Sequence, residues 1–318
     1  MLTASAVGIA IAFFGIYTFS YFFAHPSGAD SVTKIEASSS EVMHEQEEED
    51  PTFISRFSRA VVYSADDSRE IIEQAKNSLV SGAKKKVTSQ TYIVTNLDTN
   101  MNVLEKDIDT LKPIASVTKL ITAVMARKLI DQDEYITITR EITNTYGNQG
   151  KLRIGEKLRA SELLYPLLIV SSNDAAEALA MAYPGGRKEF IKEMNDWVNS
   201  IGAYRTYFRD PSGLSPQNVS TAKDLLTITK WILSHDPEIF DITLIRSKTI
   251  RTHTWTNATH FLNLSSYFGG KNGYTPEASL TSVSLFKLGR YNRKYAVVLL
   301  GSTSRDNDTL DLLHEVVK

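Results

Sequence analysis

Short apolar segments lie at both ends of the chain beyond residue 90, and they are rich in the β-branched and aromatic residues that favour strands. Residues 91–97 and 102–105 flank the turn-forming trio Asp98, Thr99 and Asn100, which predicts a β-hairpin. Near the C-terminus we predict three further strands and then a closing helix, at residues 247–256, 278–288, 295–301 and 306–318.

The middle of the chain instead repeats its apolar positions every three or four residues. After Pro113, residues 116–129 place apolar side chains such as Val117 and Leu120 on one helical face. Further helices are predicted at residues 158–170, 174–182, 187–201 and 221–233. Because strands enclose helices, we predict an α+β fold, in which one antiparallel sheet is built from the N- and C-terminal segments. A helical subdomain at about 115–240 is inserted between them, and the cleft beside the sheet is the expected site.

The first residues form an uncharged leader. Residues 2–24 are long enough as a helix to cross a ~30 Å hydrocarbon core, so we predict a transmembrane helix or signal anchor over residues 1–24. The alternative is a cleaved signal peptide ending near Ala29, although the basic n-region of such peptides is missing. We expect residues 25–50 to be an acidic disordered linker, residues 51–90 a short helical lead-in, and residues 91–318 the main domain.

Charge is unevenly distributed along the chain. The whole sequence of 318 residues has 35 bases, 37 acids and a net charge of -2, yet residues 1–50 hold eight acids and one base, a net of -7. The remainder therefore carries 34 bases and 29 acids, or +5, spread without a basic stripe. This pattern gives no indication of nucleic-acid binding. A hydrophobic content of 42% is enough for a packed core.

Several common catalytic chemistries have no matching residues. The chain has no Cys, and its six His residues are scattered without metal-ligand spacing, so we expect no metal, no cofactor and no thiol nucleophile. His253 and His260 flank Trp255 and are interpreted as structural. The sequence also lacks a Gly-x-Ser-x-Gly elbow and a glycine loop for phosphate. The search is thereby narrowed to Ser and Lys chemistry.

Ser116-Val117-Thr118-Lys119 is a Ser-x-x-Lys motif placed where a helix begins. A spacing of three puts the hydroxyl and the amine on one helical face, so a neutral Lys119 could accept the proton of Ser116. The motif alone is weak, because copies also begin at Ser31, Ser81, Ser220 and Ser284. Among the five, the Ser116 copy opens a long apolar helix and precedes two further polar elements.

The first of these elements is Ser171-Ser172-Asn173, 55 residues after Ser116. Its hydroxyl could relay a proton and its amide could bind a peptide bond, although an ordinary helix N-cap explains it equally well. The second is Gly269-Gly270-Lys271-Asn272-Gly273-Tyr274-Thr275, another 100 residues on. Here the glycines would let a substrate backbone approach, and Lys271 could bind a carboxylate.

Together these elements resemble a known family of enzymes. Residues 114–120, 171–176, 210–215 with 218–222, and 271–275 look like the D-alanyl-D-alanine carboxypeptidase and endopeptidase family of low-molecular-mass penicillin-binding proteins. The resemblance covers about residue 91 to the C-terminus. It implies a β-lactamase/transpeptidase-like fold and a serine-type D-Ala-D-Ala carboxypeptidase that cleaves D-alanyl bonds of peptidoglycan through an acyl-enzyme.

The resemblance also implies the roles of individual residues. Ser116 would be the acylated nucleophile, Lys119 its base, and Ser171 a proton relay. The main-chain N–H groups of Ser116 and Tyr274 would form the oxyanion hole. The implied substrate-binding residues are Asn173, Lys271, Asn272, Gly273, Tyr274 and Thr275.

Two departures from the family keep alternatives open. Asn272 stands where the family usually has Thr, and the chain ends after one terminal helix, so that the N-terminal helix would replace the C-terminal anchor of some members. A D,D-endopeptidase acting on cross-links and a catalytically weak peptidoglycan-binding scaffold are therefore alternatives. A β-lactamase is less favoured because no clear Glu-x-x-x-Asn element follows Ser171 at a suitable position.

The resemblance also gives the expected partners and location. Stem peptides of peptidoglycan would be substrates, β-lactams would be inhibitors, and the membrane would hold the N-terminal helix, with no nucleic acid involved. We expect a single-pass protein of the bacterial cytoplasmic membrane with its catalytic domain outside, or an exported protein if residues 1–29 are cleaved.

Overall fold

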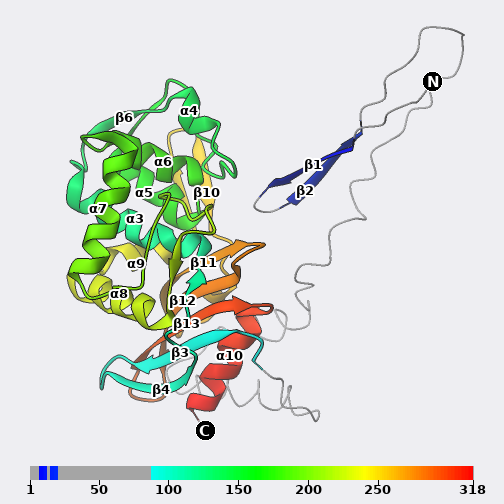
Figure 1. Ribbon diagram of the computed structural model, residues 1–318, viewed down its shortest axis with the longest axis vertical. Coiled ribbons are helices and arrows are strands. Elements are labelled where there is room, and N and C mark those ends of the chain that lie inside the picture. The colour runs from blue at the N-terminus through cyan, green and yellow to red at the C-terminus, as the bar shows by residue number, and fades with distance from the viewer. Residues whose placement is uncertain (1–6, 13–14, 21–86, 318) are drawn as a thin grey trace, which may run out of the picture. The chain divides into compact units, whose positions relative to one another are not determined.

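The computed structural model describes residues 7–12, 15–20 and 87–317 (Figure 1). The chain divides into two units, Met1–Pro51 and Thr52–Lys318, which are described separately. The predicted linker at residues 25–50 and most of the predicted lead-in at residues 51–90 lie outside the described residues.

The first unit contains an antiparallel hairpin of β1 (Val7–Ala12) and β2 (Gly15–Ser20). In these twelve residues the structure corrects the transmembrane helix predicted for residues 1–24. The physical reason is that β-branched and aromatic residues such as Val7 and Tyr17 also favour strands, and an apolar run without polar positions has no period to separate the two. Across the described ranges, no helix combines the length and the hydropathy that a membrane span requires.

The second unit is organised around a five-stranded antiparallel sheet with the order β11-β12-β13-β3-β4. Its N-terminal strands lie beside its C-terminal strands in Figure 1, as predicted. The sheet consists of β3 (Thr91–Asn96), β4 (Met101–Lys106), β11 (Tyr267–Thr275), β12 (Ser279–Leu288) and β13 (Arg293–Ser302).

Helices occupy the segment between β4 and β11, and one more closes the chain. They are α3 (Thr118–Leu129), α4 (Arg140–Thr143), α5 (Ala160–Ile169), α6 (Asn173–Ala182), α7 (Gly186–Ser200), α8 (Ala222–His235), α9 (Glu238–Thr243) and α10 (Arg305–Val316), with 3₁₀ turns η1 (Ala115–Val117) and η2 (His260–Asn263). The predicted α+β fold with inserted helices is thereby confirmed.

The two faces of the sheet have different cores because side chains alternate along each strand. On β13, Ala296, Val298 and Leu300 belong to the large core shared with the helical middle. Val297 and Leu299 point the other way, into a smaller core closed by α10. The sheet is therefore buried on both sides, between the inserted helices and the C-terminal helix.

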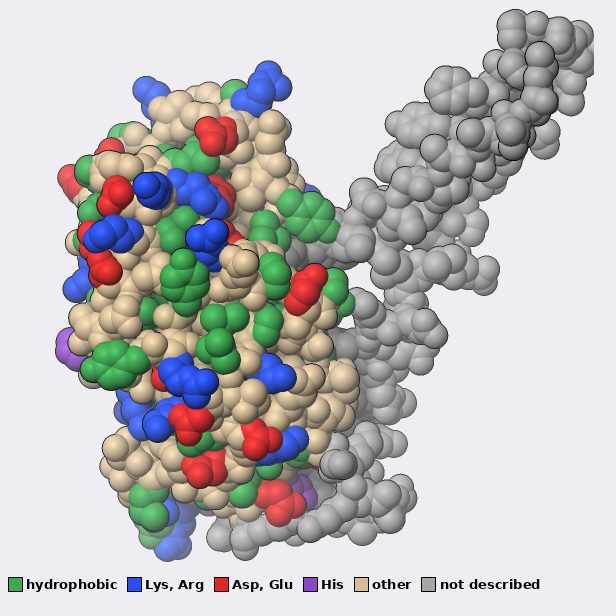
Figure 2. Space-filling model, viewed as in Figure 1, with side chains coloured by type: hydrophobic (Ala, Val, Ile, Leu, Met, Phe, Trp, Pro, Cys, Tyr) green, Lys and Arg blue, Asp and Glu red, His purple; other side chains and the backbone are tan. Residues whose placement is uncertain are grey.

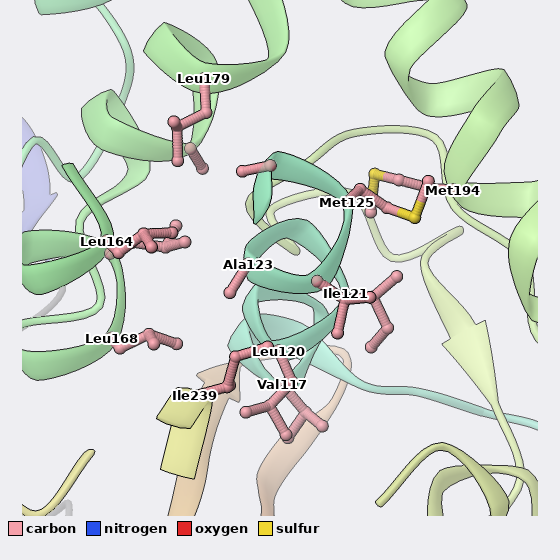
Figure 3. Close-up of a cluster of buried hydrophobic side chains, with 14 of the residues drawn as sticks. Val117, Leu120, Ile121, Ala123, Met125, Leu164, Leu168, Leu179, Met194 and Ile239 are labelled. Atoms are coloured by element: carbon pink, nitrogen blue, oxygen red, sulfur yellow. The ribbon is translucent and has the colours of Figure 1, made fainter. Parts of the chain in front are cut away.

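Helix α3 is the central element of the large core. Its side chains meet those of α5, α6, α7 and α9, as Figure 3 shows for Val117, Leu120, Ile121, Ala123 and Met125. Residues 118–126 are all buried. At about 25 cal/mol per Å² of buried apolar surface, such a helix is held by its surroundings. The rigid placement of its N-terminus positions the residues that precede and begin it.

Smaller sheets complete the fold. Residues 247–256, predicted as one strand, form a separate hairpin of β9 (Ser247–Ile250) and β10 (His253–Thr256), because the chain reverses at Arg251 with a positive φ of 52°. The remaining short pairs are β5 (Lys112–Pro113) with β8 (Val219–Ser220) and β6 (Tyr135–Thr137) with β7 (Lys157–Arg159).

On the face seen in Figure 2, Lys and Arg side chains are interspersed with Asp and Glu. Mixing of both signs agrees with the mild net charge calculated for this part of the chain.

Candidate active site

Ser116 lies in the 3₁₀ turn η1, directly before α3, and both Ser116 and Lys119 are buried. The Lys119 Nζ donates hydrogen bonds to Ser116 Oγ at 2.8 Å and to the Ser212 carbonyl at 2.6 Å. Ala115, immediately before the serine, has a positive φ of 46°. A non-glycine residue held in this region is strained, and such strain concentrates at functional sites.

Lys119 has an amine suited to accept a proton. Burial lowers its pKa well below the ordinary value, and the positive charge of Lys271 lowers it further. Asp210, Asp174 and Glu177 oppose this shift and raise the pKa. A large neutral fraction near physiological pH is what a general base requires.

Ser171 and Asn173 lie at the turn between α5 and α6. Ser171 has a positive φ of 57°, whereas Ser172 is the N-cap of α6 and accepts a hydrogen bond from the Ala175 N–H. Capping is therefore done by the middle residue of the triplet, and Ser171 is available to the cleft. The Asn173 amide donates to the Tyr146 carbonyl at 2.8 Å. Its Oδ1 is buried and, in the part of the chain that the structure describes, accepts no hydrogen bond.

Lys271 extends from β11 toward Ser171. Its Nζ donates to Ser171 Oγ at 3.0 Å and to the Asn272 carbonyl at 2.8 Å. Burial lowers the pKa of Lys271 to about 7, and the positive charge of Arg305 contributes. Two lysines thus approach the same pair of serines from opposite sides, one from the helix and one from the sheet.

Gly273 brings the strand close to the nucleophile. A Cβ at this glycine would lie 2.7 Å from the Ser116 main-chain nitrogen and 2.6 Å from Thr281 Oγ1. Only glycine therefore allows β11 to approach the main chain of Ser116 this closely. Asn272 and Tyr274 are half-buried neighbours on the same strand, and Thr275 Oγ1 accepts a hydrogen bond from Ala278 N–H at the following turn.

The structure brings all nine residues predicted from the sequence into, or next to, one cleft between α3, the α5–α6 turn and strand β11. Sequence reasoning did not find the Ser212 carbonyl, which binds Lys119, or Arg305, whose charge acts on Lys271. Ser212 follows Pro211 within a segment already recognised as family-like, but a main-chain carbonyl has no residue-type signature.

Asp174 organises the neighbouring rim of the cleft. Its carboxylate accepts the main-chain N–H groups of Gly150 and Leu152, both at 3.1 Å, and it also contacts the Ser172 hydroxyl. Within the described residues, no three His, Asp or Glu side chains gather in a way that could hold a metal ion.

A serine hydroxyl paired with a buried lysine, beside an antiparallel sheet that carries a second lysine, defines a serine-type acyl-transfer enzyme. The profile of the D-alanyl-D-alanine carboxypeptidase family matches residues 75–303. The chain therefore belongs to the D-alanyl-D-alanine carboxypeptidase family, and the enzyme class predicted from the motifs is confirmed.

Individual relatives agree with this family. A D-alanyl-D-alanine endopeptidase of Escherichia coli (strain K12) is 33% identical over 177 residues, which are 54% of this chain and 56% of the relative. A D-alanyl-D-alanine endopeptidase of Haemophilus influenzae is 31% identical over 223 residues, 68% of this chain and 76% of that relative. The chain thus spans little more than half of the first relative's length. The crystal structure of a Mycobacterium tuberculosis D-alanyl-D-alanine carboxypeptidase, 26% identical, superposes with a TM-score of 0.66 over 74% of this chain and 92% of the other.

Proposed function

We propose that this protein is a serine D-Ala-D-Ala carboxypeptidase that hydrolyses D-alanyl peptide bonds in the stem peptides of peptidoglycan. The observation that carries the proposal is the 2.8 Å hydrogen bond between Lys119 Nζ and Ser116 Oγ in a buried setting. Membership of the family supports the same substrate class.

In the acylation step, the neutral amine of Lys119 takes the hydroxyl proton of Ser116 as its oxygen attacks the carbonyl carbon of the scissile bond. The oxyanion that forms would accept the main-chain N–H groups of Ser116 and Tyr274, which the approach of Gly273 brings near one another. The leaving amine takes a proton through Ser171, which is linked to Lys271. Water then hydrolyses the ester on Ser116 and frees the enzyme.

Asn173 and Lys271 would hold the peptide during these steps. The buried Oδ1 of Asn173 can accept a substrate N–H, since it accepts no hydrogen bond from the described residues. Lys271, with the charge of Arg305 close by, suits the terminal carboxylate of a D-Ala-D-Ala peptide. Asn272, Tyr274 and Thr275 would complete the edge along which the peptide lies, and Asn272 would donate to the carboxylate in place of the usual Thr.

Labelling with a fluorescent penicillin tests the nucleophile. β-Lactams should acylate the wild-type protein, and Ser116→Ala should remove all labelling while the protein stays folded by circular dichroism. A folded wild-type protein that takes no label would overturn the proposal. It would favour the catalytically weak scaffold, which would then bind isolated cell walls without releasing products. Turnover of a chromogenic cephalosporin would instead indicate a β-lactamase.

A D,D-endopeptidase is the second candidate, because the Escherichia coli and Haemophilus influenzae relatives both carry that name. The two activities differ only in the leaving group of the scissile bond, which is a free D-Ala or a cross-linked chain. Digestion of purified muropeptides separates them by product mass. Release of D-Ala from monomeric pentapeptides supports the carboxypeptidase, and cleavage of cross-linked dimers alone supports the endopeptidase.

We also propose that the enzyme works outside the cytoplasm, where peptidoglycan lies, and is held at the membrane by residues 1–24. The support for this attachment is the uncharged apolar sequence of residues 2–24 alone. Carbonate extraction of membranes tests it, since the full chain should stay in the pellet and a chain starting at residue 30 should be released.

A further inference from the structure

Asp210 has a carboxylate that is used as a main-chain organiser. The side chain is 7% exposed and accepts hydrogen bonds from a single short loop. Its Oδ1 accepts from Ser212 N–H and Ser212 Oγ, both at 2.8 Å, and from Gly213 N–H at 2.6 Å and Leu214 N–H at 3.3 Å. Its Oδ2 accepts from Ser215 N–H at 2.7 Å. One carboxylate thus sets the path of residues 210–215.

This loop lies directly against the nucleophile. Gly213 has a positive φ of 90°, and a Cβ there would come within 1.9 Å of the Ala115 carbonyl oxygen and 2.9 Å of the Ser116 nitrogen. The preceding residue, Ser212, turns its carbonyl to the Lys119 amine at 2.6 Å. The loop therefore contacts both the nucleophile's main chain and the base's side chain.

The far side of the loop is tied to the helix that carries the base. Asn218 accepts from Asp210 N–H at 3.2 Å and donates to the Asp210 carbonyl at 2.8 Å and to Thr118 Oγ1 at 3.1 Å. Thr122, one turn later on α3, donates to the Pro211 carbonyl at 2.5 Å. A change at Asp210 would thus be transmitted to Lys119 through the Ser212 carbonyl.

We propose that Asp210 is a positioning residue for acylation: its carboxylate shapes loop 210–215 so that the Ser212 carbonyl holds the Lys119 amine against Ser116. The inference rests on the proposed function, and it assigns a role to a residue that touches neither substrate nor nucleophile. A bound amine that is free to rotate would lose the geometry that proton transfer requires.

Electrostatics give the proposal a second observable. The charged groups acting on Lys119 are Lys271 from β11, Asp174 and Glu177 from α6, and Asp210 from the loop. The charge of Asp210 raises the pKa of Lys119 against the effect of burial. Removal of that charge should therefore lower the pKa of Lys119, and the acid limb of the acylation profile should move to lower pH.

Asp210→Asn and Asp210→Ala test the proposal. The asparagine can keep the contacts of Oδ1 but places an N–H₂ against the Ser215 N–H, so that one hydrogen bond and the charge are lost. We expect the acylation rate constant for a penicillin to fall about tenfold in Asp210→Asn and about 100-fold in Asp210→Ala. The dissociation constant of the complex before acylation should change less than about threefold, because the Asp210 side chain lies outside the substrate cleft.

Asp224→Asn is the matched control. Asp224 is equally buried at 7% exposed and accepts hydrogen bonds from Arg205 N–H at 2.7 Å and Thr206 Oγ1 at 3.0 Å, but it is not among the charged groups that shift the pKa of Lys119. Its substitution should lower thermal stability while the acylation rate and pH profile stay at wild-type values.

The outcomes separate the proposed function from the positioning role. A wild-type protein that is not acylated overturns the proposed function before Asp210 is compared. An acylated wild-type protein whose Asp210→Asn variant keeps the rate and the acid limb overturns the positioning role alone. Equal losses in Asp210→Asn and Asp224→Asn also overturn it, because general destabilisation would then explain both.

Discussion

The two walls of the cleft are built on different plans. On the helical wall, Lys119 is fully buried and donates to both Ser116 and the Ser212 carbonyl, so the reacting groups are already in contact before substrate arrives. On the sheet wall, β11 presents Lys271, the half-buried Asn272 and the small Gly273 along an edge strand.

This contrast separates two roles. The helical wall holds the chemistry in a preorganised state, which lowers the cost of reaching the transition state. An edge strand has main-chain N–H and C=O groups free to pair with an extended peptide, and glycine removes the side chain that would block its approach. We therefore expect changes on the helical wall to reduce the rate constant of acylation, and changes on the sheet wall to affect binding as well.

The largest effect is expected for Lys119→Met. Methionine fills nearly the same buried volume but cannot take a proton, so the acylation rate should fall about 10³-fold, as for loss of a general base. Stopped-flow measurement with a fluorescent penicillin checks this. Lys192→Met, at an exposed pair with Asp196, is the control and should react like wild type. An unchanged rate in Lys119→Met would remove the distinction between the two walls.

The next effect is expected for Gly273→Val. Its Cβ would meet the Ser116 nitrogen at 2.7 Å, so strand and nucleophile must separate and the oxyanion site must widen. We expect a loss of about 10²-fold in kcat/KM for a D-Ala-D-Ala peptide.

Gly155→Ala is the comparison for this variant, because a Cβ there meets nothing within 4 Å and costs only the strain of a positive φ. A Gly273→Val protein with wild-type kcat/KM would show that the close approach of β11 to Ser116 is dispensable.

The smallest effect is a pH dependence that distinguishes the two lysines. Lys271, with a pKa of about 7, is positively charged below that pH and progressively neutral above it. A carboxylate binds the charged form, so kcat/KM should fall severalfold as pH rises through about 7. Lys119 acts when neutral, so its lowered pKa places the rising limb on the acid side.

A peptide ending in D-alaninamide is the control substrate, because it lacks the carboxylate and should lose the alkaline fall. An identical alkaline limb for acid and amide would contradict the assignment of Lys271 to carboxylate binding.

The same contrast appears in what could be predicted from the sequence. Helix α3 was predicted almost to its ends, because its apolar period and Pro113 are local signals. Strand β11 was missed as a strand, although Lys271 and Gly273 were recognised by their motif. Three glycines interrupt the apolar pattern of β11, and it is β12 that holds the strand in register, with Lys271 opposite Val283.

Two other differences have the same origin. Residues 247–256 have strand propensity throughout, but the reversal at Arg251 divides them into a hairpin outside the main sheet. The uncharged residues 2–24 suit a helix by length and a strand by composition, and β1 and β2 show the second in the described part. Local preference leaves such segments undecided until a partner strand or a turn acts on them.

By itself, the sequence determined the family, the order of strands and helices, and the residue types of the site, since each of these is written in local spacing. Tertiary structure decided which of the five Ser-x-x-Lys motifs is buried beside Ser171 and Lys271, because burial and the resulting pKa shifts depend on segments 100 residues apart. It also decided that the Ser212 carbonyl, held by Asp210, binds the base. A main-chain oxygen acquires such a role only through the path of the folded chain.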